Sequence, residues 1–242
     1  MKTLLAITIS LLAFGISMIG CASEQTEQIA STKVEAKASK ADPNFFPVYP
    51  SGSTPADSIT DPRDGERYAT RKIGRDTWLV ENMRYAAPGS MLNPDNPSAS
   101  YGRLYTVIAA QTACPEGWHL PSDAEWDALE IAHGMPDSFV HKGGWRGEHA
   151  VHLKSTSGWD KDGSGTDSLG FNVLPAGYFF SEKIAGENAG LEGLGFSAGY
   201  WSSMVDSVAY ARFMFDVRVF VNKWADERNE SEAALSCRCV KD

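Results

Sequence analysis

The segment Cys114–Trp126 constrains the fold most, because its thirteen residues combine a turn, a short extended stretch and the start of a helix. Pro115 and Gly117 are typical of a turn, since proline fixes φ and glycine tolerates positive φ. Ser122 and Glu125 have the spacing of a capping box, in which each side chain bonds the amide of the other residue. A helix is therefore predicted to begin directly after Ser122.

The residues after this start have the pattern of a helix that packs by one side. Trp126, Leu129 and His133 recur at helical spacing and fall on one face. Gly134 and Pro136 are typical of a helix end. We therefore expect a helix over residues 122–133 with an aromatic residue in the core.

The rest of the chain predicts an α+β fold. Only residues 104–111 and 122–133 read as helices, so about two helices are expected, and glycine-rich turns separate several short strand-like runs. A few helices among such strands indicate α+β with antiparallel pairing, and the alternating pattern of a parallel sheet is absent. The strand-like runs are Tyr68–Ile73, Thr77–Glu81, Phe171–Leu174, Ala209–Val221 and Leu235–Val240.

The first residues resemble a bacterial lipoprotein signal. Leu4–Ile19 is apolar but shorter than the ~20 residues that span a bilayer. Met18–Cys21 resembles a lipobox, so we expect a signal peptide over 1–20 and lipid attachment at Cys21. The alternative is an ordinary secretory signal or a short membrane anchor. Ala22 follows the cysteine, which favours sorting to the outer membrane or cell surface.

A flexible tether and an acidic charge follow from composition. Residues 21–60 are rich in Ser, Thr, Glu, Lys and Ala, and they carry too little apolar surface to order themselves. The formal net charge of -9 disfavours nucleic acid as a partner, because phosphates are repelled. The sequence therefore predicts a membrane-anchored domain over 61–242, large enough for one buried core.

Several motifs are spread in order along residues 61–242. They are Asp61–Tyr68, Ile73–Trp78, Glu81–Tyr85, Tyr101–Tyr105, Cys114–Trp126, Leu153–Thr156, Leu174–Tyr178 and Arg238–Asp242. Together they resemble the Fibrobacter succinogenes major paralogous domain, and the resemblance covers about 180 residues. It implies a secreted or surface-attached domain without an established biochemical activity. More weakly, Leu120–Trp126 is similar to a helix of sulfatase-modifying and C-type-lectin-like domains, which implies a related single-domain α+β fold.

Three cysteines remain if Cys21 is lipidated, and export permits a disulfide. Cys237 and Cys239 fall on one face of a predicted strand, so strand alternation cannot choose between them as partners of Cys114. The resembled family has a cysteine at the position of Cys239 and an apolar residue at that of Cys237. The resemblance therefore implies a bridge from Cys114 to Cys239 and leaves Cys237 as a free thiol. A zinc site made of the three cysteines is the disfavoured alternative, because exported thiols oxidise.

An aspartate-rich loop is a candidate calcium site. Asp160, Asp162 and Ser164 occupy positions 1, 3 and 5 of an EF-hand-like loop, but Phe171 stands where the bidentate carboxylate belongs. The loop is therefore not an EF-hand. A looser calcium site that adds Asp167 remains open, and the alternative is a solvated polar turn.

Two further patterns carry little weight. Gly195–Gly199 matches a nucleophile elbow, but a glycine-rich loop precedes it and no histidine follows His152, so an esterase is strongly disfavoured. His149 and His152, with His141 nearby, would suit zinc only on a helix, and the surrounding glycines favour a loop.

Tryptophans are the remaining candidates for ligand binding. Trp118, Trp126 and Trp201 lie in motifs that predict core positions. Trp145 and Trp159 lie in glycine-rich loops, and we expect them to face a ligand. Aromatic rings at such positions suit stacking on sugars.

These observations favour a lipid-anchored surface protein with a non-catalytic binding or adhesion domain, with a polysaccharide or a surface protein as partner. The alternative is an enzyme on a sulfatase-modifying-like scaffold. His119 and Glu125 allow a catalytic interpretation, but capping and packing account for both. The enzyme would also need a reactive cysteine pair, and the cysteines serve better as a disulfide.

Overall fold

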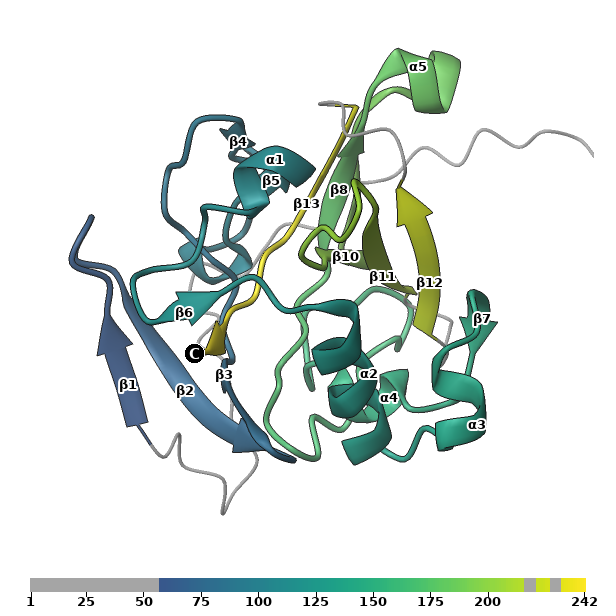
Figure 1. Ribbon diagram of the computed structural model, residues 1–242. Coiled ribbons are helices and arrows are strands. Elements are labelled where there is room, and N and C mark those ends of the chain that lie inside the picture. Colours follow the sequence, from purple (N-terminus) through teal and green to yellow (C-terminus); the bar gives the residue numbers. More distant parts are fainter. Residues whose placement is uncertain (1–56, 216–220, 227–231) are drawn as a thin grey trace, which may run out of the picture. The chain divides into compact units, whose positions relative to one another are not determined.

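The computed structural model describes residues 57–215, 221–226 and 232–242 (Figure 1). The predicted signal peptide, Cys21 and nearly all of the predicted tether lie outside these residues. The last residues assigned to the tether, Asp57–Thr60, instead form a strand paired with Arg67–Thr70. Among the described residues, no helix has the length and apolar character needed to cross a bilayer.

The first sheet joins strands from both ends of the domain. Its order is β1-β2-β3-β14-β6, and every neighbouring pair is antiparallel. The strands are β1 (Asp57–Thr60), β2 (Arg67–Ile73), β3 (Asp76–Leu79), β14 (Val240–Lys241) and β6 (Trp118–His119). β14 therefore lies inside the sheet, although it comes last in the sequence.

The second sheet is larger and mostly antiparallel. Its order in the described residues is β4-β5-β13-β8-β10-β11-β12-β7, and β9 also pairs with β8. Only β8 and β10 pair in parallel. The strands are β4 (Ser90–Met91), β5 (Leu104–Thr106), β7 (Gly144–Arg146), β8 (Ala176–Phe180), β9 (Gly190–Leu194), β10 (Ser197–Trp201), β11 (Ala209–Phe215), β12 (Val221–Asp226) and β13 (Ala233–Leu235).

The helices are short, and they are more numerous than predicted. They are α1 (Val107–Ala110), α2 (Asp123–Ala132), α3 (Asp137–Val140), α4 (Ala150–Leu153), α5 (Glu182–Ala185), and the 3-10 turns η1 (Ala99–Tyr101) and η2 (Gly186–Asn188). The α+β class is confirmed, but the count of about two helices is wrong. A helix of one turn presents too few residues to show a helical period in the sequence.

Three local predictions need correction. Residues 104–106 of the first predicted helix form β5, and α1 begins only after Thr106, whose hydroxyl accepts from the amide of Ala109 at 3.3 Å. His152, predicted to lie in a loop, is part of α4. Phe171–Leu174 holds only an isolated bridge between Val173 and Lys154 rather than a strand.

The predicted start of α2 is confirmed in detail. The amide of Glu125 donates to Ser122 Oγ at 3.2 Å, and the amide of Ser122 donates to Glu125 Oε2 at 2.7 Å. Both reciprocal bonds of a capping box are therefore present. Trp126, Leu129 and His133 are buried, so the predicted apolar face packs into the core.

An aromatic cluster joins α2 to the sheets. The Trp78 and Trp126 rings lie 5.2 Å apart, and Phe171 meets them edge-on at 5.3 and 5.8 Å. Tyr200 of β10 completes the cluster at 5.7 Å from Trp126. Such tilted and edge-on pairs are favourable beyond the area they bury.

The segment 232–242 connects the two sheets. β13 lies between β5 and β8, and β14 lies between β3 and β6. Between them, Cys239 forms a disulfide with Cys114, which confirms the predicted bridge. Cys237 is the free buried cysteine, and burial raises the pKa of its thiol. Both cysteines lie between strands rather than on one predicted strand.

Candidate functional site

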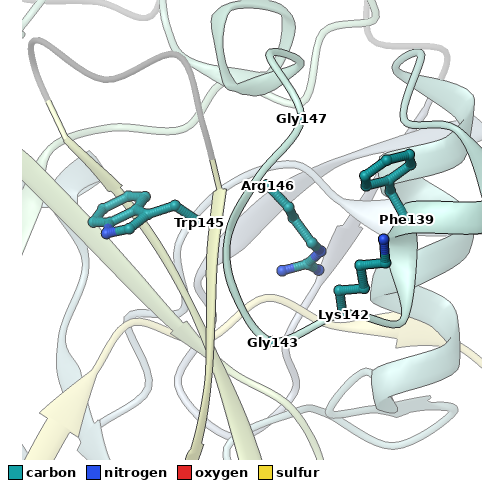
Figure 2. A pocket seen from close by; sticks show the side chains of 6 residues that line it. All are labelled: Phe139, Lys142, Gly143, Trp145, Arg146 and Gly147. Atoms are coloured by element: carbon teal, nitrogen blue, oxygen red, sulfur yellow. The ribbon is translucent and has the colours of Figure 1, made fainter.

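The candidate site lies on both sides of β7, an edge strand that pairs with β12 in the described part of the chain. Successive side chains of a strand point to opposite faces. Figure 2 accordingly shows the Trp145 ring on one side of the strand, and Arg146 on the other side together with Phe139 and Lys142.

On the first side, aromatic rings form a continuous row. We call Trp145, Phe196 and Phe215 the aromatic surface. The Trp145 ring is 45% exposed and lies 5.4 Å from Phe215, which lies 6.1 Å from Phe196. The row continues inward through Phe213 to Tyr178. It arises because Tyr178 on β8, and Phe213 and Phe215 on β11, occupy alternate strand positions on one sheet face.

On the second side, a cleft of about 330 Å³ opens between α3 and β7. Phe139 is 47% exposed, and Lys142 Nζ lies 3.8 Å from the centre of its ring. The cleft thus combines an apolar wall, a cation and open glycine backbone. Its lining residues are Phe139, Lys142, Gly143, Trp145, Arg146 and Gly147.

Arg146 is the deepest of these residues, with only 4% of its surface exposed. Its Nη2 donates to both carboxylate oxygens of Glu130 at 2.8 Å. Its Nε and Nη1 have no hydrogen-bond partner among the described residues. Arg146 therefore lines the cleft, and its two nitrogens without a hydrogen-bond partner are buried beneath the surface.

Behind Arg146 lies a buried charge network, which we define as Asp123, Asp127, Glu130, Arg146 and Arg212. Arg212 is fully buried on β11 and contacts three of the four carboxylates of α2. Its Nη1 lies 2.6 Å from Asp123, its Nη2 donates to Asp127 at 2.9 Å, and its Nε donates to Glu130 at 3.0 Å. The network fixes α2 on the second sheet.

Histidines adjoin the network on two sides. His149 Nε2 lies 3.2 Å from Glu130, and His141 Nδ1 lies 2.8 Å from Asp127. Burial opposes ionisation of Glu130, but His149, Arg212 and Arg146 together hold its pKa below the usual value. Burial also lowers the pKa of Arg146. Glu130 is therefore an ionised acceptor for its basic neighbours.

The two tryptophans predicted to face a ligand differ. Trp145 is exposed as expected, whereas the prediction for Trp159 is wrong, since it is only 7% exposed. Trp159 Nε1 donates to Ser155 Oγ at 3.0 Å and to the Val173 carbonyl at 3.2 Å. The glycine-rich loop turns this ring into the core, so Trp159 is removed from the candidate site.

The aspartate-rich loop does not gather its oxygens into a calcium site. Asp167 turns inward, where its Oδ1 accepts from the Asn172 amide at 2.7 Å, and burial raises its pKa to about 6. Asp160 lies against Gly195, and Asp162 is exposed. The described residues hold no group of three His, Cys, Asp or Glu side chains suited to a metal. The Asp160, Asp162, Ser164 and Asp167 set is therefore corrected to a turn with one buried carboxyl group.

The other chemical candidates have structural roles. His119 lies 2.7 Å from Asp242 and 3.0 Å from Glu125, so it ties the end of β14 to the start of α2. Burial opposes protonation of His119, but hydrogen bonds to both carboxylates raise its pKa. Ser197, the serine of the Gly195–Gly199 pattern, is fully buried inside β10.

Sequence reasoning missed Arg146, Lys142 and Phe139. Lys142 and Phe139 are exposed residues of a short helix and its following turn, and nothing in their spacing marks them. The acidic network left a faint signal, because Asp123, Asp127 and Glu130 have i, i+4, i+7 spacing.

Comparison with known proteins gives one match. A family model described as the Fibrobacter succinogenes major domain matches residues 72–241, which is more than half of the chain. No curated protein and no solved structure matches the chain.

Proposed function

We propose a function for a chain that belongs to the Fibrobacter succinogenes major domain family: a lipid-anchored protein of the outer membrane or cell surface whose folded domain binds glycan without catalysis. The observation that carries the proposal is the aromatic surface. Trp145 is exposed and the rings of Phe196 and Phe215 are half-buried beside it, and exposed apolar surface on a folded domain marks interaction sites. Planar rings such as Trp145 offer an apolar face to a sugar while their edges stay near water.

The arrangement of the aromatic surface supports a chain-like ligand. Trp145, Phe215 and Phe196 follow one another across the end of the second sheet, at centroid distances of 5.4 and 6.1 Å. A row of rings accepts successive units of an extended polymer better than one compact molecule. We therefore favour an extracellular polysaccharide over a small metabolite, with glycan on a surface protein as a second source.

Replacing Trp145 with alanine is expected to weaken glycan binding at least tenfold, because the stacking contact is lost. Trp145 lies on an edge strand and is 45% exposed, so its removal leaves the core intact. A glycan array probed with the full-length protein identifies the glycan, and calorimetric titration measures the affinity. Leu92→Ala is the control, since Leu92 is an exposed apolar residue, at 56%, on another part of the domain. Unchanged affinity in Trp145→Ala would refute the role of the aromatic surface.

The membrane anchor rests on the sequence of residues 1–22, which lie outside the described structure. The apolar run that ends before Cys21 supports cleavage and lipidation there, and several acyl chains give firm anchoring. Cells fed an alkyne fatty acid are expected to label the wild-type protein and not Cys21→Ser. Equal labelling of the two proteins would contradict the anchor.

One observation favours the second candidate, an enzyme. Glu130 and Arg146 of the buried charge network, with the adjoining His149, lie directly behind a cleft, and such groupings of titratable groups occur at active sites. The enzyme proposal also assumes a scaffold related to sulfatase-modifying and C-type-lectin-like domains, which the weaker sequence resemblance supports. An experimental structure of a complex with a glycan hit would separate binding from turnover, because an enzyme would cleave or modify the ligand.

A further inference from the structure

We propose that the cleft beside β7 binds the carboxylate of an acidic sugar, with Arg146 and Lys142 as the recognising groups. The inference rests on the proposed glycan-binding function and adds the substrate class, namely the uronic acid units of an anionic polysaccharide. The proposed carboxylate site lies on the side of β7 opposite to the aromatic surface.

The unused donors of Arg146 are the first argument. Nη2 is occupied by the two Glu130 oxygens at 2.8 Å, whereas Nε and Nη1 have no acceptor in the described structure. A buried donor without an acceptor is unfavourable, and it is relieved when an acceptor reaches it. Nε and Nη1 lie on different edges of the guanidinium plane, so each can donate a single charge-assisted hydrogen bond to one oxygen of an incoming carboxylate. Arg146 is therefore suited to bind a second carboxylate from the side of the cleft.

The walls of the cleft fit the rest of a sugar unit. Phe139 is 47% exposed and offers an apolar face, and Lys142 Nζ is held 3.8 Å from the centre of that ring. Figure 2 shows the end of the Lys142 side chain beside the Phe139 ring, on the same side of β7 as Arg146. Because Lys142 is exposed and flexible, it can turn toward an incoming anion and open the way to the guanidinium.

The acidic residues behind the cleft do not cancel this attraction. Asp123, Asp127 and Glu130 each contact Arg212 within 3.0 Å. Arg146 is held closely only by Glu130, since its nearest distance to Asp127 is 3.8 Å. Arg212 thus offsets part of this negative charge from the sheet side, and Arg146 and Lys142 supply positive charge on the cleft side.

The position of β7 at the sheet edge joins the two surfaces. Trp145 and Arg146 are consecutive, so a polymer that crosses over the edge strand contacts the Trp145 ring on one face and the cleft on the other. Because these two side chains point to opposite faces of the strand, different units of one chain would occupy the two sites.

The test compares matched ligands on the full-length protein in detergent. The ligands are tetramers of galacturonic acid and of mannuronic acid, each beside the same tetramer with its carboxyl groups reduced to alcohols. We expect an acidic tetramer to bind at least tenfold more tightly than its reduced form. Lys142→Gln is expected to weaken the acidic tetramer at least fivefold and to leave the reduced one unchanged. Lys72→Gln removes the same charge from an exposed site on β2 and is expected to change neither.

The outcomes separate this inference from the proposed function. Equal affinity for acidic and reduced tetramers, or no loss in Lys142→Gln, overturns the carboxylate site. Binding of neither acidic tetramer overturns it too, whereas neutral glycan hits lost in Trp145→Ala would still uphold glycan binding. Conversely, acidic binding that depends on Lys142 but not on Trp145 supports the cleft and refutes the aromatic surface.

Discussion

Replacing Arg212 with methionine is expected to lower the free energy of unfolding by about 3–5 kcal/mol, the usual effect of removing one partner from a buried ion pair. Arg212 is fully buried and holds Asp123, Asp127 and Glu130 at 2.6, 2.9 and 3.0 Å. Methionine fills a similar volume, so the loss comes mainly from leaving carboxylates without their cation. Urea denaturation followed by tryptophan fluorescence measures the change.

An exposed arginine gives the matched control. Arg75 pairs with Asp76 at 3.3 Å, but its side chain is 69% exposed. Exposed ion pairs contribute only about 0–1 kcal/mol. Arg75→Met should therefore leave the unfolding midpoint almost unchanged. Similar losses in the two variants would show that burial of the network contributes little.

Removing the Cys114–Cys239 disulfide is the second change with a large expected effect. The bridge spans 125 residues, for which the chain-entropy model gives about 5 kcal/mol of stabilisation. The double variant Cys114→Ala and Cys239→Ala is therefore expected to unfold at much lower urea concentration than the oxidised wild type. Reduction of the wild type with a thiol should produce the same shift.

The free cysteine of the described residues provides the control for this test. Cys237 is buried close to the bridge in sequence but is not part of it. Cys237→Ala removes one sulfur atom from the core without opening the loop, so its cost should be clearly smaller. If the double variant retained the midpoint of the oxidised protein, the expected contribution of the bridge would be refuted.

The sequence predicted best where the signal is local. The capping box of Ser122 and Glu125 is defined by residues three positions apart, and helix α2 begins there. The disulfide was also predicted, but from the resemblance to the family, because spacing alone could not choose between Cys237 and Cys239 as the partner of Cys114. Single-turn helices such as α4 were missed, since they hold too few residues to show a period.

The candidate site was harder to predict because distant strands build it. Arg146 and Arg212 look like ordinary surface residues until β7 and β11 bring them to α2. Trp145 and Trp159 both lie beside glycine, so local sequence gave no means to tell an exposed ring from a buried one. Asp167 likewise reads as a loop carboxylate, and only the packing of residues far along the chain shows that it is buried.

The placement of residues 232–242 has a consequence for biosynthesis. A ribosome releases the chain from its N-terminus, so β13 and β14 are the last strands to become available, yet each lies inside a sheet. Until then, β14 is missing between β3 and β6, and β13 is missing between β5 and β8. Such long-range pairing slows folding. The two sheets therefore cannot be completed until these residues are synthesised, and a transcript that stops before codon 232 yields a product in which both sheets lack an inner strand.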